Sequence, residues 1–336
     1  MKRLKASAGF SLIELMIALT IGLVVLTVLA TVFARTSSGR GDLERVTRLV
    51  ENSRFAADIV GEDVRHAGFY GTFLPPTDTI FVNASPCGWN TADVTQLGWQ
   101  PTAIPARYPA QLQGWDDPVA GVVELNCLPN RIPGTDVLAI RRVSTQPVTA
   151  AQVVNTSVYV QASQCINDPV LLRVSNDVSQ FSLRTASCIV GTLAGIRRYF
   201  VRAYYVASCN ECNPSDGIPT LKRMEVVNNV YRVVSLAEGV ANLQFEYAFD
   251  TNGDGSPDQM QTSTTGTGAT ASWANVVAVR MHLLMRSSEP GMSADTTPTI
   301  FSLGAGHAAE TCPDRYKCRL LTTTFRLNNI AGRRET

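Results

Sequence analysis

The chain has 336 residues, of which 45% are hydrophobic and 17% are charged. Its 29 lysines and arginines balance 28 acidic residues, so the formal net charge is +1. This balance gives no general attraction to nucleic acid, and we expect no nucleic-acid partner. The three histidines, His66, His282 and His307, form no metal-binding HxxxH motif, and no GxSxG nucleophile elbow occurs. The sequence therefore favours a protein that is not an enzyme.

An apolar run of 25 residues, 10–34, contains one ionisable side chain, Glu14. As a helix this run is about 37 Å long, which is enough to cross a hydrocarbon layer of about 30 Å. Lys2, Arg3 and Lys5 precede it, so we expect the amino terminus to stay in the cytoplasm. A carboxylate within lipid costs about 2.5 to 3.5 kcal/mol at mid-depth, so Glu14 is expected to find a partner outside its own helix.

The small residues of a cleavage site, 6–9, come before the apolar run, whereas an ordinary signal peptide is cut after it. Gly9 followed by residues 10–15, FSLIEL, resembles the leader of the type IV pilin family. This resemblance implies that a prepilin peptidase cuts after Gly9 and methylates the new amine of Phe10. It also implies that Glu14 meets the terminal amine of a neighbouring subunit during assembly.

An amphipathic helix is predicted from about Asp42 to Ala67, after a polar junction at residues 35–41 that contains two glycines. We expect its apolar stripe to pack on one side of a globular body. The stripe consists of Leu43, Val46, Val50, Ser53, Ala57, Val60, Val64 and Ala67. Residues 51–59 and 65–71 resemble the corresponding runs of PilW-type minor pilins, which narrows the family to one minor class.

The predicted fold class is α+β, with one long N-terminal helix, half transmembrane and half amphipathic, packed on an antiparallel β-sheet with long disulfide-tied loops. The predicted segments are the leader 1–9, the transmembrane or filament-core helix 10–34, the amphipathic helix 35–67 and a periplasmic β-rich body 68–336. Strands are expected at 137–143, 158–162, 170–174, 198–207, 221–227, 231–236, 243–249, 276–287 and 320–327.

Apolar and polar residues alternate in the strands at 243–249 and 276–287, so one face of the sheet is expected to be packed. Residues 72–136 have no clear periodicity and contain three of the four tryptophans. We expect Trp89, Trp99 and Trp115 to pack beneath these loops, the alternative being a ligand surface.

Eight cysteines follow the helix, on the exported side, where the pilin resemblance implies an oxidising bacterial periplasm. We expect four disulfides between sequence neighbours: Cys87 with Cys127, Cys165 with Cys188, Cys209 with Cys212, and Cys312 with Cys318. The alternative is a zinc site at the single CxxC, but the spacing of the last two cysteines is too loose for its second pair.

Oxygen side chains occupy every second position of one loop, at Asp250, Asn252, Asp254, Ser256 and Asp258. This pattern is the first half of a calcium loop, with a glycine at position 255 for the tight turn. The loop lacks the glutamate that closes an EF-hand at position twelve, so the predicted calcium site is short and weak. The alternative is a polar hairpin tip, because Asn-Gly and Asp-Gly also favour turns.

The pilin resemblance implies a minor pilin that initiates or caps a type IV pilus. Its implied partners are other minor and major pilins, including the PilV and PilX kinds, a PilY-class tip adhesin, the inner-membrane assembly platform and the prepilin peptidase. It would cross the bacterial inner membrane once, with its body in the periplasm, and then enter a pilus at the cell surface. The alternatives are a minor pseudopilin of a type II secretion system and a membrane-tethered periplasmic ligand-binding or catalytic domain.

Overall fold

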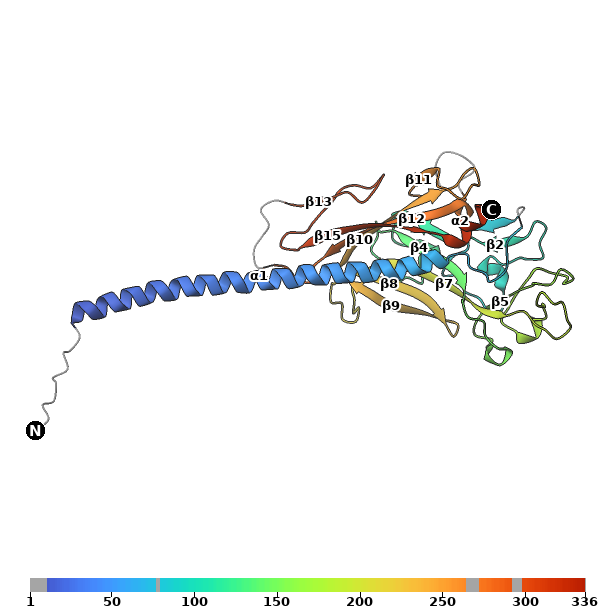
Figure 1. The fold of residues 1–336 in the computed structure, drawn as a ribbon, viewed down its shortest axis with the longest axis horizontal. Helices are drawn as coiled ribbons and strands as arrows, with labels where there is room; N and C mark the ends of the chain where they lie inside the picture. Colours follow the sequence, from blue (N-terminus) through green and yellow to red (C-terminus); the bar gives the residue numbers. More distant parts are fainter. Residues whose placement is uncertain (1–10, 77–78, 264–271, 292–297, 336) are drawn as a thin grey trace, which may run out of the picture.

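The computed structural model describes residues 11–76, 79–263, 272–291 and 298–335. A single helix, α1 (Leu12–His66), runs from the amino-terminal side of the molecule into a β-rich body (Figure 1). Its 55 residues correspond to about 82 Å of helix. Roughly the first half of α1 projects away from the body, and the second half lies along it (Figure 1).

No break separates the two halves of α1, although the sequence indicated a polar junction at residues 35–41. The backbone remains helical through Gly39 and Gly41. A glycine inside a helix costs only about 1 kcal/mol relative to alanine, and no proline is present to remove a hydrogen bond or to clash. The stable helical segments on both sides therefore extend across the junction.

The body contains two larger sheets, where the sequence had suggested one. The first has seven strands. In this sheet β7 pairs with β4, β5 and β8. Each of these three strands also pairs with one more: β4 with β3, β5 with β6, and β8 with β9. Its strands are β3 (Leu112–Trp115), β4 (Val137–Val143), β5 (Tyr159–Ala162), β6 (Leu172–Ser175), β7 (Ile196–Ala207), β8 (Thr220–Val227) and β9 (Val230–Glu238). All of these pairs are antiparallel, as predicted.

The second sheet has four antiparallel strands in the order β11, β10, β12, β15. These are β10 (Val240–Phe249), β11 (Gln259–Gln261), β12 (Val276–Arg286) and β15 (Cys318–Arg326). The prediction of one packed face is wrong here, because Gln244 and Glu246 are buried on the other face of β10. Loops cover that face: Glu246 accepts a hydrogen bond from the amide of Ala305, and Gln244 donates one to the carbonyl of Gly134.

Shorter elements complete the body. A parallel pair joins β1 (Ile80–Val82) to β2 (Arg107–Pro109), and an antiparallel pair joins β13 (Ile300–Phe301) to β14 (Glu310–Thr311). The chain ends in a short helix, α2 (Asn328–Arg334). Five single-turn 3₁₀ helices lie at Val94–Leu97, Val123–Leu125, Ala150–Gln152, Val178–Gln180 and Trp273–Asn275. Residues 72–136 are thus largely irregular, as expected, with three short strands.

The body half of α1 lies between the two sheets and contacts β9, β12, β15, β4 and α2 (Figure 1). Val60 and Val64 of the predicted stripe are fully buried in the largest core cluster, together with residues of both sheets. Leu43 and Val46, however, are 70% and 39% exposed. Full burial of α1 against the body begins at Leu49, which is 4% exposed.

Four disulfides tie the loops together, with the four pairs expected from the order of the cysteines: Cys87–Cys127, Cys165–Cys188, Cys209–Cys212 and Cys312–Cys318. Beneath the 72–136 loops, Trp99 is fully buried and packs edge-on against Tyr70, Tyr108 and Tyr199. This tryptophan therefore supports a second core cluster, as expected.

Candidate functional site

The amino-terminal half of α1 presents a continuous apolar surface with no partner in the described chain. The 22 residues Leu12–Phe33 are long and apolar enough to span a membrane, and none of their most apolar window is buried against the body. The hydroxyls of Thr20, Thr27 and Thr31 donate to carbonyls three or four residues earlier in the helix. Their polar groups are therefore satisfied within the helix, which makes them compatible with lipid.

The predicted processing residues, Gly9 and Phe10, lie outside the described residues, so processing stays a prediction. Glu14 lies in the first turn of α1, where its carboxylate accepts a hydrogen bond from the backbone amide of Ser11 at 2.9 Å. The side chain is exposed. A charged group from outside the chain can therefore reach this carboxylate.

At the other end of α1, a buried carboxylate joins the helix to the seven-stranded sheet. The Asp63 cluster consists of Asp63 on α1, Arg142 on β4, and Arg202 and Tyr204 on β7. Arg202 Nη1 donates to both carboxylate oxygens, at 2.7 and 2.9 Å. Arg142 Nε donates to Oδ1 at 3.0 Å, and the Tyr204 hydroxyl donates to Oδ2 at 2.5 Å.

Charge compensation keeps Asp63 ionised. Burial raises the pKa of this carboxyl, but the positive charges of Arg202 and Arg142 and the hydrogen bonds from Arg202 and Tyr204 have the larger combined effect, so its pKa is lowered. The pattern of the sequence does not reveal this site. The signal was an acidic residue next to the apolar stripe, between Val60 and Val64, on a helix otherwise expected to bury only apolar and small residues.

A close contact lies half a turn from Asp63. Gly61 faces the ring of Phe325 on β15, and a Cβ at this position would lie only 2.7 Å from the Phe325 Cδ1 atom. The guanidinium of Arg65 stacks over the same ring at 5.4 Å. Both sheets are thus held to α1 within about one turn, one through Asp63 and the other through Phe325.

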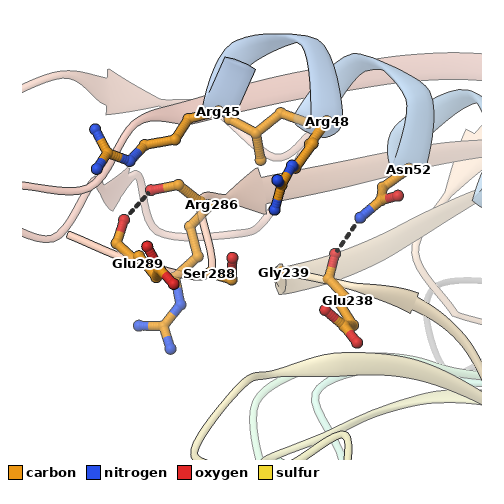
Figure 2. A pocket seen from close by; sticks show the side chains of 10 residues that line it. Arg45, Arg48, Asn52, Glu238, Gly239, Arg286, Ser288 and Glu289 are labelled. Carbon is orange, nitrogen blue, oxygen red and sulfur yellow. Dashed lines mark hydrogen bonds between the residues drawn. The ribbon is translucent and has the colours of Figure 1, made fainter. Parts of the chain in front are cut away.

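A shallow pocket lies where the membrane-proximal end of the body meets α1 (Figure 2). Arg45, Arg48 and Asn52 of α1 face residues 238–239 of the β9–β10 turn and residues 286–289 at the end of β12. Asn52 Nδ2 donates to the Glu238 carbonyl at 3.3 Å, which fixes the turn against the helix (Figure 2).

The predicted calcium loop connects β10 to β11, and its side chains are already hydrogen-bonded. Asn252 Nδ2 lies between two carboxylates, 3.2 Å from Asp254 Oδ2 and 3.3 Å from Asp258 Oδ1. Ser256 donates its backbone amide to Asp254 at 2.7 Å. The loop therefore brings together Asn252, Asp254 and Asp258.

Asp250, at the start of the loop, also bonds to the C-terminal helix. Its carboxylate accepts from the amides of Gly253 and Gly255, at 2.6 and 2.9 Å, and from Arg334 of α2 at 3.0 Å. Burial raises the pKa of Asp250, but these hydrogen bonds and the Arg334 charge lower it overall. In this arrangement Asp250 joins the loop to α2.

Two family models match the chain. Residues 4–30 match the prokaryotic N-terminal methylation motif, and residues 203–329, from β7 to α2, match Type IV Pilus-assembly protein W. Comparison with curated proteins and with solved structures gave no match. The methylation motif and the apolar helix are consistent with a membrane-anchored pilin, and the β-rich body packs on the second half of that helix.

The second match specifies the kind of pilin. Together with the methylation motif, it supports a PilW-type type IV pilin and fits a minor pilin in type IV pilus assembly. These matches identify a structural subunit.

Proposed function

We propose that this minor pilin initiates or caps the pilus and is not a regular component of the shaft. The observation that carries this proposal is the width of the body around the helix: β15 and β12 lie on one side of α1 and β9 on another (Figure 1). A subunit within a helical shaft has neighbours on every side, whereas one at an end has a free side. A body that extends on both sides of its helix fits an end position better.

In this proposal the subunit first crosses the inner membrane through residues 10–34, with its amino terminus in the cytoplasm and its body in the periplasm. The prepilin peptidase cuts between Gly9 and Phe10. Other minor pilins, the major pilin, a PilY-class tip adhesin and the assembly platform are then its partners. Mass spectrometry of the protein from piliated cells checks the processing step, because an intact leader there would contradict it.

Labelling of sheared pili tests the end position. We expect antibodies against the body to mark one end of each pilus, and deletion of the gene to reduce the number of pili more than their length. Labels spaced along the shaft, in numbers that increase with length, would contradict the proposal. Co-purification with a secretion-system platform in place of pilus components would favour the pseudopilin alternative.

We also propose that the loop at 250–258 binds calcium. Asn252, Asp254 and Asp258 already converge, and two carboxylates held this close repel one another unless a cation lies between them. Asp250 contributes as a ligand only if its carboxylate reorients from Arg334. A backbone or hydroxyl oxygen of Ser256 and water would complete the shell.

Calorimetric titration with calcium tests the loop, using the full chain in detergent. We expect a dissociation constant of about 10⁻⁴ to 10⁻³ M, which is typical of extracellular modules, and no binding in Asp254→Ala. Asp314→Ala is the matched control, because it removes an exposed acidic residue elsewhere in the body. Equal heats in both variants, or none in the unaltered chain, would leave the loop as a hairpin tip.

A further inference from the structure

A second group of acidic side chains, far from the calcium loop in sequence, surrounds a buried histidine. Asp116 and Asp117 directly follow β3, and His307 lies in the segment between β13 and β14. One ligand atom from each of these three residues lies within 4.8 Å of the others. Residues almost 200 positions apart are thus brought together at one edge of the body.

The histidine has one ring nitrogen with a partner and one without. His307 Nδ1 is 3.3 Å from Asp117 Oδ2, which is within hydrogen-bond distance. His307 Nε2 is buried and has no hydrogen-bond partner among the residues that the structure describes, and the side chain is only 4% exposed. Its nearest carboxylate oxygen is Asp116 Oδ1 at 3.9 Å. A buried imidazole nitrogen without a partner is costly, so it points to a ligand in that gap.

Neutral donors hold the carboxylates in place. Thr262 donates its hydroxyl to Asp116 Oδ2 at 2.8 Å, and Gln244 donates its amide to Asp117 Oδ1 at 3.0 Å. In each aspartate, therefore, one oxygen is fixed by a neutral neighbour and the other faces His307. Ligating carboxylates and histidines in metal sites are oriented by outer hydrogen bonds of this kind.

From this geometry we infer that Asp116 Oδ1 and His307 Nε2 bind a divalent transition-metal ion of the zinc class, with Asp117 orienting the imidazole through Nδ1. An imidazole nitrogen combined with a carboxylate oxygen is a donor set that suits zinc better than calcium or magnesium. The Asp116 side chain is 30% exposed, which gives a hydrated ion a route to the site and leaves room for water as further ligands.

Such an ion would join two parts of the body. Asp116 directly follows β3 of the seven-stranded sheet, and His307 belongs to the segment whose Ala305 amide bonds to Glu246 on β10 of the four-stranded sheet. Binding to the folded state alone would therefore stabilise the contact between the sheets by mass action. This inference does not depend on the place of the subunit in the pilus.

Zinc titration of the oxidised full chain in detergent tests the inference, after chelator treatment and removal of the chelator. We expect one zinc per chain and a zinc-dependent rise in melting temperature. His307→Ala and Asp116→Asn should abolish both at up to about 1 mM zinc, since the rise depends on the ratio of zinc to its dissociation constant. Asp117→Asn, which keeps an acceptor for Nδ1, should bind one zinc about 10-fold more weakly.

The matched control is His66→Ala, because His66 lies at the end of α1 and its Nδ1 interacts with the Glu62 carbonyl of its own helix. It should bind zinc as the unaltered chain does. If His307→Ala fails to fold, Asp116→Asn still decides, because that side chain is partly exposed and the substitution is isosteric. No zinc binding by the unaltered chain, or equal binding by Asp116→Asn, would overturn the inference.

Discussion

The two halves of α1 obtain their stability from different surroundings. Residues Leu12–Phe33 are apolar enough to span a membrane and their most apolar window is not buried, whereas the turns around Val60 and Asp63 are buried between two sheets. The backbone hydrogen bonds are the same in both halves, so the side chains make the difference. The first half requires lipid or neighbouring helices, and the second half is complete within the chain.

This contrast separates assembly from folding. A substitution in the body half of α1 should lower the free energy of unfolding of the body. A substitution in the membrane half should leave the body intact and change only what the helix does with other molecules.

The largest effect is expected from Asp63→Ala. Removal of this carboxylate leaves the partly buried charges of Arg142 and Arg202 without their shared partner. Breaking a buried ion pair in this way costs about 3 to 5 kcal/mol of unfolding free energy. Denaturant titration of the full chain in detergent measures it. Asp58→Ala on the exposed face of the same helix is the control, and equal losses in the two variants would contradict the role of the cluster.

Gly61→Ala and Gly39→Ala should have opposite signs. A methyl group at Gly61 would overlap the Phe325 ring, and overpacking of this kind costs about 1 to 3 kcal/mol. At Gly39 nothing lies within 4 Å of the added methyl group, so the gain in helix propensity should stabilise α1 by about 1 kcal/mol. Thermal melts of the two variants make the comparison. Destabilisation by Gly39→Ala would mean that the junction needs its glycine.

Acid should destabilise the folded protein through Asp63. Because the pKa of Asp63 is lowered in the folded protein, its charged form contributes stability above the unfolded pKa of about 3.9, and this contribution is lost as the pH falls through the folded pKa. The unaltered chain should therefore lose up to about 1.4 kcal/mol more per pH unit below pH 4 than Asp63→Asn does. Denaturant titrations at pH 3 to 6 check this. Parallel pH profiles for the two proteins would show that Asp63 does not titrate as described.

Periodicity was sufficient to predict nine of the strands and the two parts of α1, one apolar and one amphipathic. Alternation and β-branched residues define a strand locally, and an apolar run of 25 residues has few other uses. The disulfide pairs followed the order of the cysteines. The strands and the helix depend on residues that are close in sequence, which is why they could be inferred without the structure.

The division into two sheets, the Asp63 cluster and the His307 site could not be predicted in this way. Asp63 meets Arg142 and Arg202 from 79 and 139 residues further along the chain. His307 meets Asp117 across 190 residues. No local pattern records such pairs. The calcium pattern contains its own ligands, but it gave no indication that Arg334 of α2 would pair with Asp250.

The smallest effect on stability, and the sharpest separation of the two halves of α1, is expected from Glu14→Ala. This carboxylate bonds within the described chain only to the Ser11 amide, about 50 residues from the body contacts of Asp63, so the unfolding of the body should not change. The variant should still be processed and inserted in the membrane, because the apolar run is intact. Its incorporation into pili should fall sharply, since Glu14 is the one carboxylate within the run that can attract a neighbour's terminal amine.

Quantitative immunoblots of sheared pili and of membranes measure how much of the variant reaches each of these two pools. Glu51→Ala is the control, because Glu51 is an exposed glutamate in the body half of α1. Normal incorporation of Glu14→Ala would show that the apolar surface alone directs assembly.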